Sequence, residues 1–154
     1  MKISELLTKE GISVGNSFAD KESVIDCMIG LHEQLGNLND REEFGKAVIA
    51  REAKAVTAFG TGIAVPHAKS ASVKRAGLTA VTVPQGVDYG AQDGEPCRLF
   101  FMIAVPDAST DTHVDVLAGL MRMLVDSSFT KALAAAGSPD EFMDLIRTKE
   151  ERME

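Results

Sequence analysis

The sequence is poor in the residues that mark several common classes of protein. It has no tryptophan, one tyrosine and two cysteines among 154 residues. Cys27 and Cys97 lie far apart, without a C-x-x-C motif or a histidine at ligand spacing, so they indicate neither a zinc site nor a disulfide framework. No apolar run reaches the roughly 18 residues of a membrane span, and residues 1–5 (MKISE) include an acid where a signal peptide has basic and apolar regions. We therefore expect a cytoplasmic protein with no segment inserted in a membrane.

Positive charge is also scarce. Sixteen Lys and Arg stand against 23 Asp and Glu, which gives a formal net charge of −7. A chain with this balance has no basic field for a phosphate backbone, so nucleic acid is not an expected partner. The 45% of hydrophobic residues and the modest number of prolines and glycines are typical of a globular chain. No repeat or linker divides the sequence, which predicts one domain over residues 1–154.

Three helices have clear signals at their ends. Asp20 can cap a helix that ends at Gly36, with apolar residues recurring at helical spacing between them. Asn39 and Glu42 stand in a capping-box arrangement that predicts the start of the next helix at Asn39. Ser138, followed by a proline and two acids, predicts the start of a C-terminal helix.

Two strands are predicted in the second half of the chain. Residues 78–83 form an apolar stretch that should end at Pro84. Residues 98–105 are almost continuously apolar, as expected of a central strand that is covered on both faces. Together with the helices, these strands predict an α/β fold: a mixed sheet of about five strands, flanked by helices on both faces.

The best candidate for chemistry is His67, in the stretch 59–68 (FGTGIAVPHA). The β-branched residues favour a short strand through the two glycines, and Pro66 should mark the end of that strand because it has no N–H to donate. An imidazole at a strand terminus could face a large partner. The plainer interpretation, an ordinary turn residue, is equally open from these ten residues alone.

Three other side chains also have functional and structural interpretations. Arg51, near a predicted helix C-terminus, could simply complement the helix dipole, but it precedes His67 by only sixteen residues. His113 falls in the first turn of a predicted helix, where it is either solvent-facing or a neutral hydrogen-bond donor to an anion. His32 has no metal-binding or acid–base partner four residues away and is interpreted as a structural or surface residue.

These motifs resemble a known family. Residues 60–68 (GTGIAVPHA), with the pair Arg51 and Glu52 upstream, look like the phosphorylation-site signature of the fructose/mannitol-type enzyme IIA domains (EIIA type 2) of the bacterial phosphoenolpyruvate-dependent sugar phosphotransferase system. Residues 93–96 (DGEP), residues 102–106 (MIAVP) and His113 follow the order and spacing of the same family. The resemblance covers essentially the whole chain and is closer to fructose-type members than to nitrogen-related ones.

The resemblance implies a phosphotransferase that carries a phosphoryl group. The phosphocarrier HPr would phosphorylate His67, and His67 would pass the group to an enzyme IIB, with a membrane IIC component involved only indirectly. Arg51 and His113 match positions that stabilise the group during transfer. An imidazole with a pKa of ~6.5 is a neutral nucleophile near pH 7, so it needs no separate base. No G-x-x-x-x-G-K-[ST] loop is present, and no cofactor or metal is expected.

Two alternatives remain open at this point. One is a nitrogen-type regulatory EIIA, whose phosphorylation state would switch its binding partners without sugar transport. The other is a metal-dependent hydrolase using His67 and His113, which is poorly supported because no carboxylate or cysteine stands at ligand spacing around either. The sequence does not identify the sugar. The length of the chain favours IIB and IIC parts on separate proteins.

Overall fold

The computed structural model describes residues 2–109 and 112–153, with the side chains of residues 112 and 113 left out. The helices are α1 (Ile3–Leu6), α2 (Lys21–Gln34), α3 (Arg41–Lys54), α4 (Thr112–Leu124), α5 (Ser127–Ala134) and α6 (Pro139–Met153), with a 3-10 turn at Lys9–Gly11. The strands are β1 (Ile12–Ser13), β2 (Ala58–Gly60), β3 (Ile63–Ala64), β4 (His67–Ser70), β5 (Gly77–Val87) and β6 (Cys97–Pro106).

The strands form one mixed sheet in the order β1-β5-β6-β3-β2, and β4 also pairs with β6. β5 and β6 are antiparallel, whereas β1 is parallel to β5 and both β3 and β4 are parallel to β6. The predicted central strand is therefore confirmed as β6. The sheet has six strands where about five were expected.

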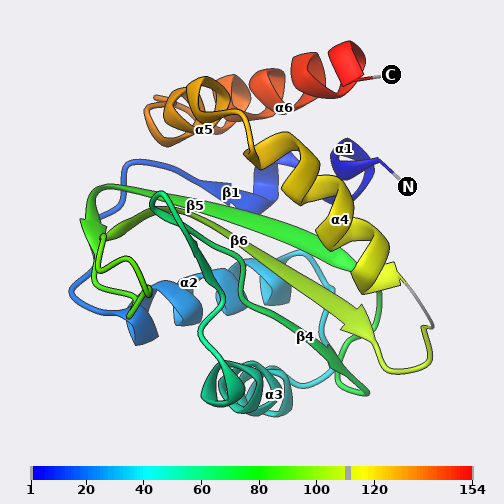
Figure 1. Cartoon of the computed structure of the whole chain (residues 1–154). Coiled ribbons are helices and arrows are strands. Elements are labelled where there is room, and N and C mark those ends of the chain that lie inside the picture. The colour runs from blue at the N-terminus through cyan, green and yellow to red at the C-terminus, as the bar shows by residue number, and fades with distance from the viewer. Residues whose placement is uncertain (1, 110–111, 154) are drawn as a thin grey trace.

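Helices cover both faces of this sheet, as predicted. Figure 1 shows α2 and α3 on one side, and α1, α4, α5 and α6 on the other. Successive side chains of β6 point to opposite faces: Phe101 and Ile103 lie in the core under the second group of helices, and Phe100 and Met102 in the core under α2 and α3. This double burial explains why β6 is apolar at nearly every position.

The helix starts are confirmed at two places and corrected at a third. Asp20 accepts a hydrogen bond from Ser23 N at 2.9 Å, and Ser138 Oγ accepts one from Glu141 N at 3.1 Å. The predicted start at Asn39 is wrong by one residue: Asp40 caps α3. The reason is tertiary, because Asn39 N donates to Ser72 O at 2.7 Å and holds Asn39 outside the helix.

The predicted end of a strand at Pro84 is also wrong, because β5 runs on to Val87. The register between β5 and β6 is irregular between Thr82 and Val87, so the N–H that proline lacks falls where the ladder is already interrupted. Within the described residues, none of the helices combines the length and apolarity needed to cross a membrane.

Candidate functional site

A tight turn places the site stretch against the central strand. β2 and β3 pair antiparallel through Thr61, whose φ of 56° is unusual for a β-branched residue, and the glycines on either side also have positive φ. The carboxylate of Asp93 accepts a hydrogen bond from Thr61 N at 3.1 Å. The turn delivers Ile63 to its parallel partner Leu99 in β6.

The chain leaves the ladder for two residues and then rejoins it at His67. Val65 N donates to Thr57 O at 2.9 Å instead of to β6, and Pro66 has no N–H to donate. Ile103 N donates to Pro66 O at 3.1 Å, so β4 continues along the same edge of β6. The prediction that one strand runs to Pro66 and stops at His67 needs correction: β3 ends at Ala64, and His67 is the first residue of β4.

The imidazole of His67 is half-buried, and its orientation is set by the backbone just before it. Nδ1 lies 2.8 Å from Val65 O. Because a carbonyl oxygen only accepts, Nδ1 must carry the hydrogen. In the neutral ring the lone pair is therefore on Nε2, which is the nitrogen able to act as a nucleophile.

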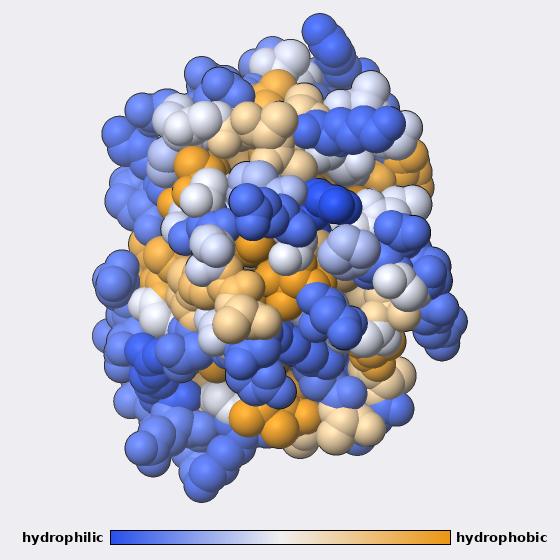
Figure 2. Space-filling model, turned by 90° about the vertical axis from the view of Figure 1, so that its left-hand side faces the viewer, coloured by the Kyte–Doolittle hydropathy of each residue, from blue (hydrophilic) through white to orange (hydrophobic). Residues whose placement is uncertain are grey.

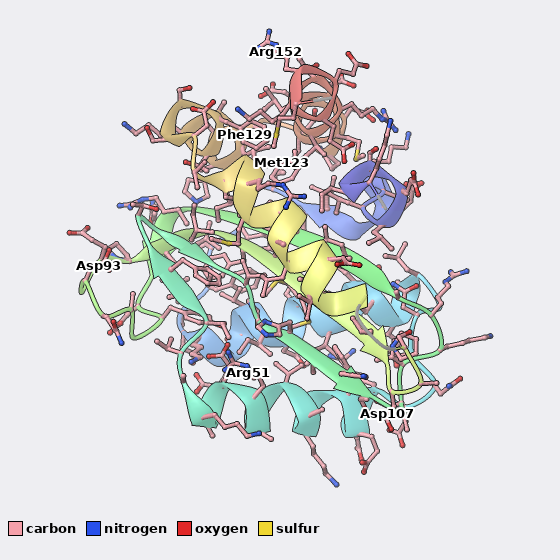
Figure 3. All side chains as sticks on the ribbon, turned by 45° about the vertical axis from the view of Figure 1, so that its right-hand side comes forward. Arg51, Asp93, Asp107, Met123, Phe129 and Arg152 are labelled. Carbon is pink, nitrogen blue, oxygen red and sulfur yellow. The ribbon has the colours of Figure 1, made fainter. Side chains whose placement is uncertain are left out.

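His67 shares a hollow of about 400 Å³ with residues of α3. Arg51 and Lys54 line it from α3, one helical turn apart, and His67 and Lys69 line it from β4, two residues apart and so on one face of the strand. Three alanines complete the lining: Ala47, Ala50 and Ala68. Figure 3 shows Arg51 on the side of α3 that faces the sheet. The structure thus brings Arg51 and His67 to one cavity.

The charge of this hollow is opposite to that of the chain. Its lining carries the cations of Arg51, Lys54 and Lys69, on a chain whose formal net charge is −7. The Arg51 guanidinium is oriented by a hydrogen bond from Nη1 to Ala55 O at 2.9 Å, which uses one of its five N–H donors. Sequence reasoning missed both lysines. The sequence did contain a signal for them: Lys54 follows Arg51 by one helical turn, and Lys69 follows His67 by two strand positions, so each shares a face with its neighbour.

The prediction that His113 joins this site is not tested by the structure. Its backbone lies in the first turn of α4, as expected, but its side chain lies outside the described residues. Figure 1 shows α4 on the opposite face of the sheet from α3.

His32 is structural, which is one of the two roles predicted for it, and is not a surface residue: it is fully buried and contacts β6 from α2. Its Nε2 lies 3.0 Å from Met102 O and its Nδ1 lies 3.0 Å from Asn37 Nδ2, so Nε2 donates and Nδ1 accepts. Burial lowers the pKa of the ring to about 4, because the charged form would lose its hydration.

Other surface features lie away from these residues. Another hollow, of about 540 Å³, lies between α5 and α6. Lys149 and Asp126, which both line it, form an ion pair at 2.8 Å. On the face that Figure 2 shows, apolar residues reach the surface in separate patches among hydrophilic ones. Within the described part of the chain, no three His, Cys, Asp or Glu side chains are grouped so that they could hold a metal ion.

Comparison with known proteins identifies relatives over nearly the full chain. Residues 5–149 match the family described as "Phosphoenolpyruvate-dependent sugar phosphotransferase system, EIIA 2". The chain is 40% identical over 146 residues to the fructose-specific EIIABC component of Bacillus subtilis, covering 95% of this chain but only 23% of that protein. It is 33% identical over 144 residues to the fructose-specific EIIA component of Haloferax volcanii, covering 94% of each.

Solved structures agree with the sequence relatives. The fold matches nitrogen regulatory protein IIA-Ntr from Neisseria meningitidis with a TM-score of 0.85 at 27% identity, covering 94% of this chain and 98% of the other. It matches the IIA protein in the complex of mannitol enzyme IIA with phosphorylated enzyme IIB from Escherichia coli with a TM-score of 0.81 at 28% identity, covering 93% and 99%.

Proposed function

The chain belongs to the EIIA 2 family of the phosphoenolpyruvate-dependent sugar phosphotransferase system, and on that basis we propose that it carries a phosphoryl group on His67. The observation that supports this role best is the orientation of the ring. Nδ1–H is bound to Val65 O, which assigns the lone pair to Nε2 beside a cationic hollow. The nucleophilic nitrogen of His67 and the cations that can stabilise a phosphoryl group therefore lie at the same hollow.

The transfer step follows from this geometry. Nε2 of His67 attacks phosphorus, a new N–P bond forms, and the N–P bond to the donor imidazole breaks, returning its electron pair to the donor. The ring of His67 becomes more positive as Nε2 gives up its pair, and the Nδ1–H bond to Val65 O strengthens with it. Charge on the transferring group lies on its three equatorial oxygens, which the cation of Arg51 can stabilise.

The partners are proposed from the family and its relatives. The donor is phosphorylated HPr, and the acceptor is a fructose-type enzyme IIB. The Escherichia coli relative was solved in complex with a phosphorylated IIB, and two relatives are fructose-specific components. His113 is proposed as a hydrogen-bond donor to the phosphoryl oxygens. The proposed site of action is the cytoplasm, where phosphoenolpyruvate is available.

Phosphate incorporation tests this function. The purified chain, incubated with labelled phosphoenolpyruvate, enzyme I and HPr, should take up one phosphoryl group on His67. A phosphoramidate is labile in acid and stable in base, so mild acid should release the label. Label that persists in His67→Ala, or that survives acid, contradicts the proposal.

The regulatory alternative is supported by two relatives. The chain is 32% identical over 149 residues to a nitrogen regulatory protein homologue of Haemophilus influenzae, and its fold matches that of IIA-Ntr. A regulatory protein would accept the phosphoryl group but would not pass it to a sugar. Fructose is added together with membranes that hold the IIB and IIC components. If the protein is a transport component, it should lose its phosphoryl group; if it is regulatory, it should remain phosphorylated.

A further inference from the structure

Glu52, the neighbour of Arg51 in α3, is a nearly buried carboxylate with several partners. Thr57 Oγ1 and Tyr89 OH donate to its Oε1, the latter at 3.0 Å. Lys21 Nζ lies 2.8 Å from its Oε2, and Thr57 N donates to the same oxygen at 3.4 Å. Only 7% of the Glu52 side chain is exposed. These contacts satisfy both oxygens of a charge that would otherwise be costly to bury.

The direction of Glu52 is a consequence of helix geometry. Adjacent residues of a helix do not face each other, so Arg51 and Glu52 project to different sides of α3. Arg51 lines the hollow of His67, whereas Glu52 points into the protein and binds the chain that follows the helix. Lys21 closes the network by lying 4.3 Å from the centre of the Tyr89 ring, within cation–π distance.

Glu52 binds the segment 55–57 at Thr57, and two hydrogen-bond routes lead from this segment to the site. In the first, Ala55 O accepts from Arg51 Nη1 at 2.9 Å and so orients the guanidinium. In the second, Thr57 O accepts from Val65 N at 2.9 Å, and Val65 O accepts from Nδ1 of His67 at 2.8 Å. Both groups of the transfer step thus depend on one short backbone segment.

We propose that Glu52 is a positioning residue for phosphoryl transfer. By fixing the segment 55–57, its carboxylate maintains the orientation of the Arg51 guanidinium and keeps the proton of the His67 ring on Nδ1. This inference rests on the proposed function. It assigns Glu52 no contact with the phosphoryl group, and its effect passes through Ala55 and Thr57.

Glu52→Gln is the sharpest test because it keeps the shape of the side chain. A glutamine has one oxygen, so it can accept either from the two hydroxyls or from Thr57 N, but not from both sets. We expect phosphoryl transfer from HPr to slow by about 10-fold in Glu52→Gln and by about 100-fold in Glu52→Ala, the scale of a misplacement near 1 Å. The ¹⁵N chemical shifts of the His67 ring should change from those of the tautomer with the proton on Nδ1 toward those of a mixture of the two neutral tautomers.

Asp126→Asn is the matched control. Asp126 also pairs with a lysine, Lys149, at 2.8 Å, and Lys149 also lies near an aromatic ring. This pair joins the N-cap of α5 to α6, away from the hollow of His67. The control should lose stability without changing the transfer rate or the His67 signals. A folded Glu52→Gln protein with wild-type rate and wild-type ring signals would overturn the inference. Failure of the unmodified chain to accept label would instead contradict the proposed function, and the ring signals would still test the positioning.

Discussion

His32 and Pro66 hydrogen-bond to the two ends of one peptide group, the group that joins Met102 to Ile103 in β6. Nε2–H of His32 donates to Met102 O at 3.0 Å, and Ile103 N donates to Pro66 O at 3.1 Å. Hydrogen bonds in such a chain polarise one another. The buried, neutral imidazole of His32 therefore strengthens the hydrogen bond from Ile103 N to Pro66 O, which fixes the residue immediately before His67.

The buried state of His32 predicts that stability falls in mild acid. Its pKa is about 4 in the folded protein and ~6.5 when unfolded, so the unfolded chain binds more protons between these values. This contribution is complete above pH 6.5 and is lost as the pH falls toward 4. We expect a loss of about 2 kcal/mol between pH 7 and pH 5. Urea unfolding at the two pH values measures it. An NMR signal of His32 that titrates near pH 6.5 in the folded protein would contradict it.

Arg51 should affect transfer far more than stability. Arg51→Ala is expected to slow phosphoryl transfer to His67 by roughly 10²–10³, the cost of losing a donor that stabilises charge in the transition state. Arg51→Lys keeps the charge but loses the planar fork that can hold two oxygens, so it should also be clearly impaired. The lost bond to Ala55 O costs only about 1 kcal/mol. Rapid-quench labelling measures the transfer rate, and thermal unfolding measures stability. Wild-type transfer rates in both variants would show that the role of Arg51 is only structural.

His113→Ala should still accept label, but slowly. The nucleophile remains in this variant, so the number of phosphoryl groups taken up should stay at one while the rate falls. The measurement is the time course of labelling from phosphorylated HPr, followed by the time course of discharge to IIB. Unchanged rates in both directions would remove His113 from the proposed site.

Lys69 should attract the negatively charged phosphoryl group to the hollow. Lys69→Gln is expected to lower the transfer rate at low ionic strength by about 2- to 5-fold and to flatten the dependence of the rate on salt, because exposed charges are screened beyond roughly 10 Å at 0.1 M. Lys74→Gln is the control, since Lys74 is also exposed but does not line the hollow. Equal salt dependence in the two variants would contradict a local role for Lys69.

The sequence was sufficient where a signal is local. Asp20 and Ser138 cap the helices that they were predicted to cap, and the apolar run of β6 identified the central strand. The cap at Asn39 and the strand end at Pro84 were wrong because distant partners decide them: Ser72 holds Asn39, and the irregular register with β6 accommodates Pro84.

The same distinction applies to the site. The motif around His67 pointed to the nucleophile, but the orientation of its ring depends on Val65, whose N–H is held by Thr57. Neither bond has a signature in the sequence. Glu52 was visible only as half of an Arg-Glu pair, and its burial against Tyr89, 37 residues later, required the fold.

The division of the core by the sheet affects how this protein can tolerate change. Arg51, Glu52 and His32 all stand on the layer of α2 and α3, whereas α5 and α6 pack in the other layer, behind β6. Effects of substitutions at distant, unconnected positions add without coupling. Substitutions around Phe129 and Phe142 should therefore add to those at Arg51 and Glu52 without coupling, because no core cluster of the described residues joins the two sets.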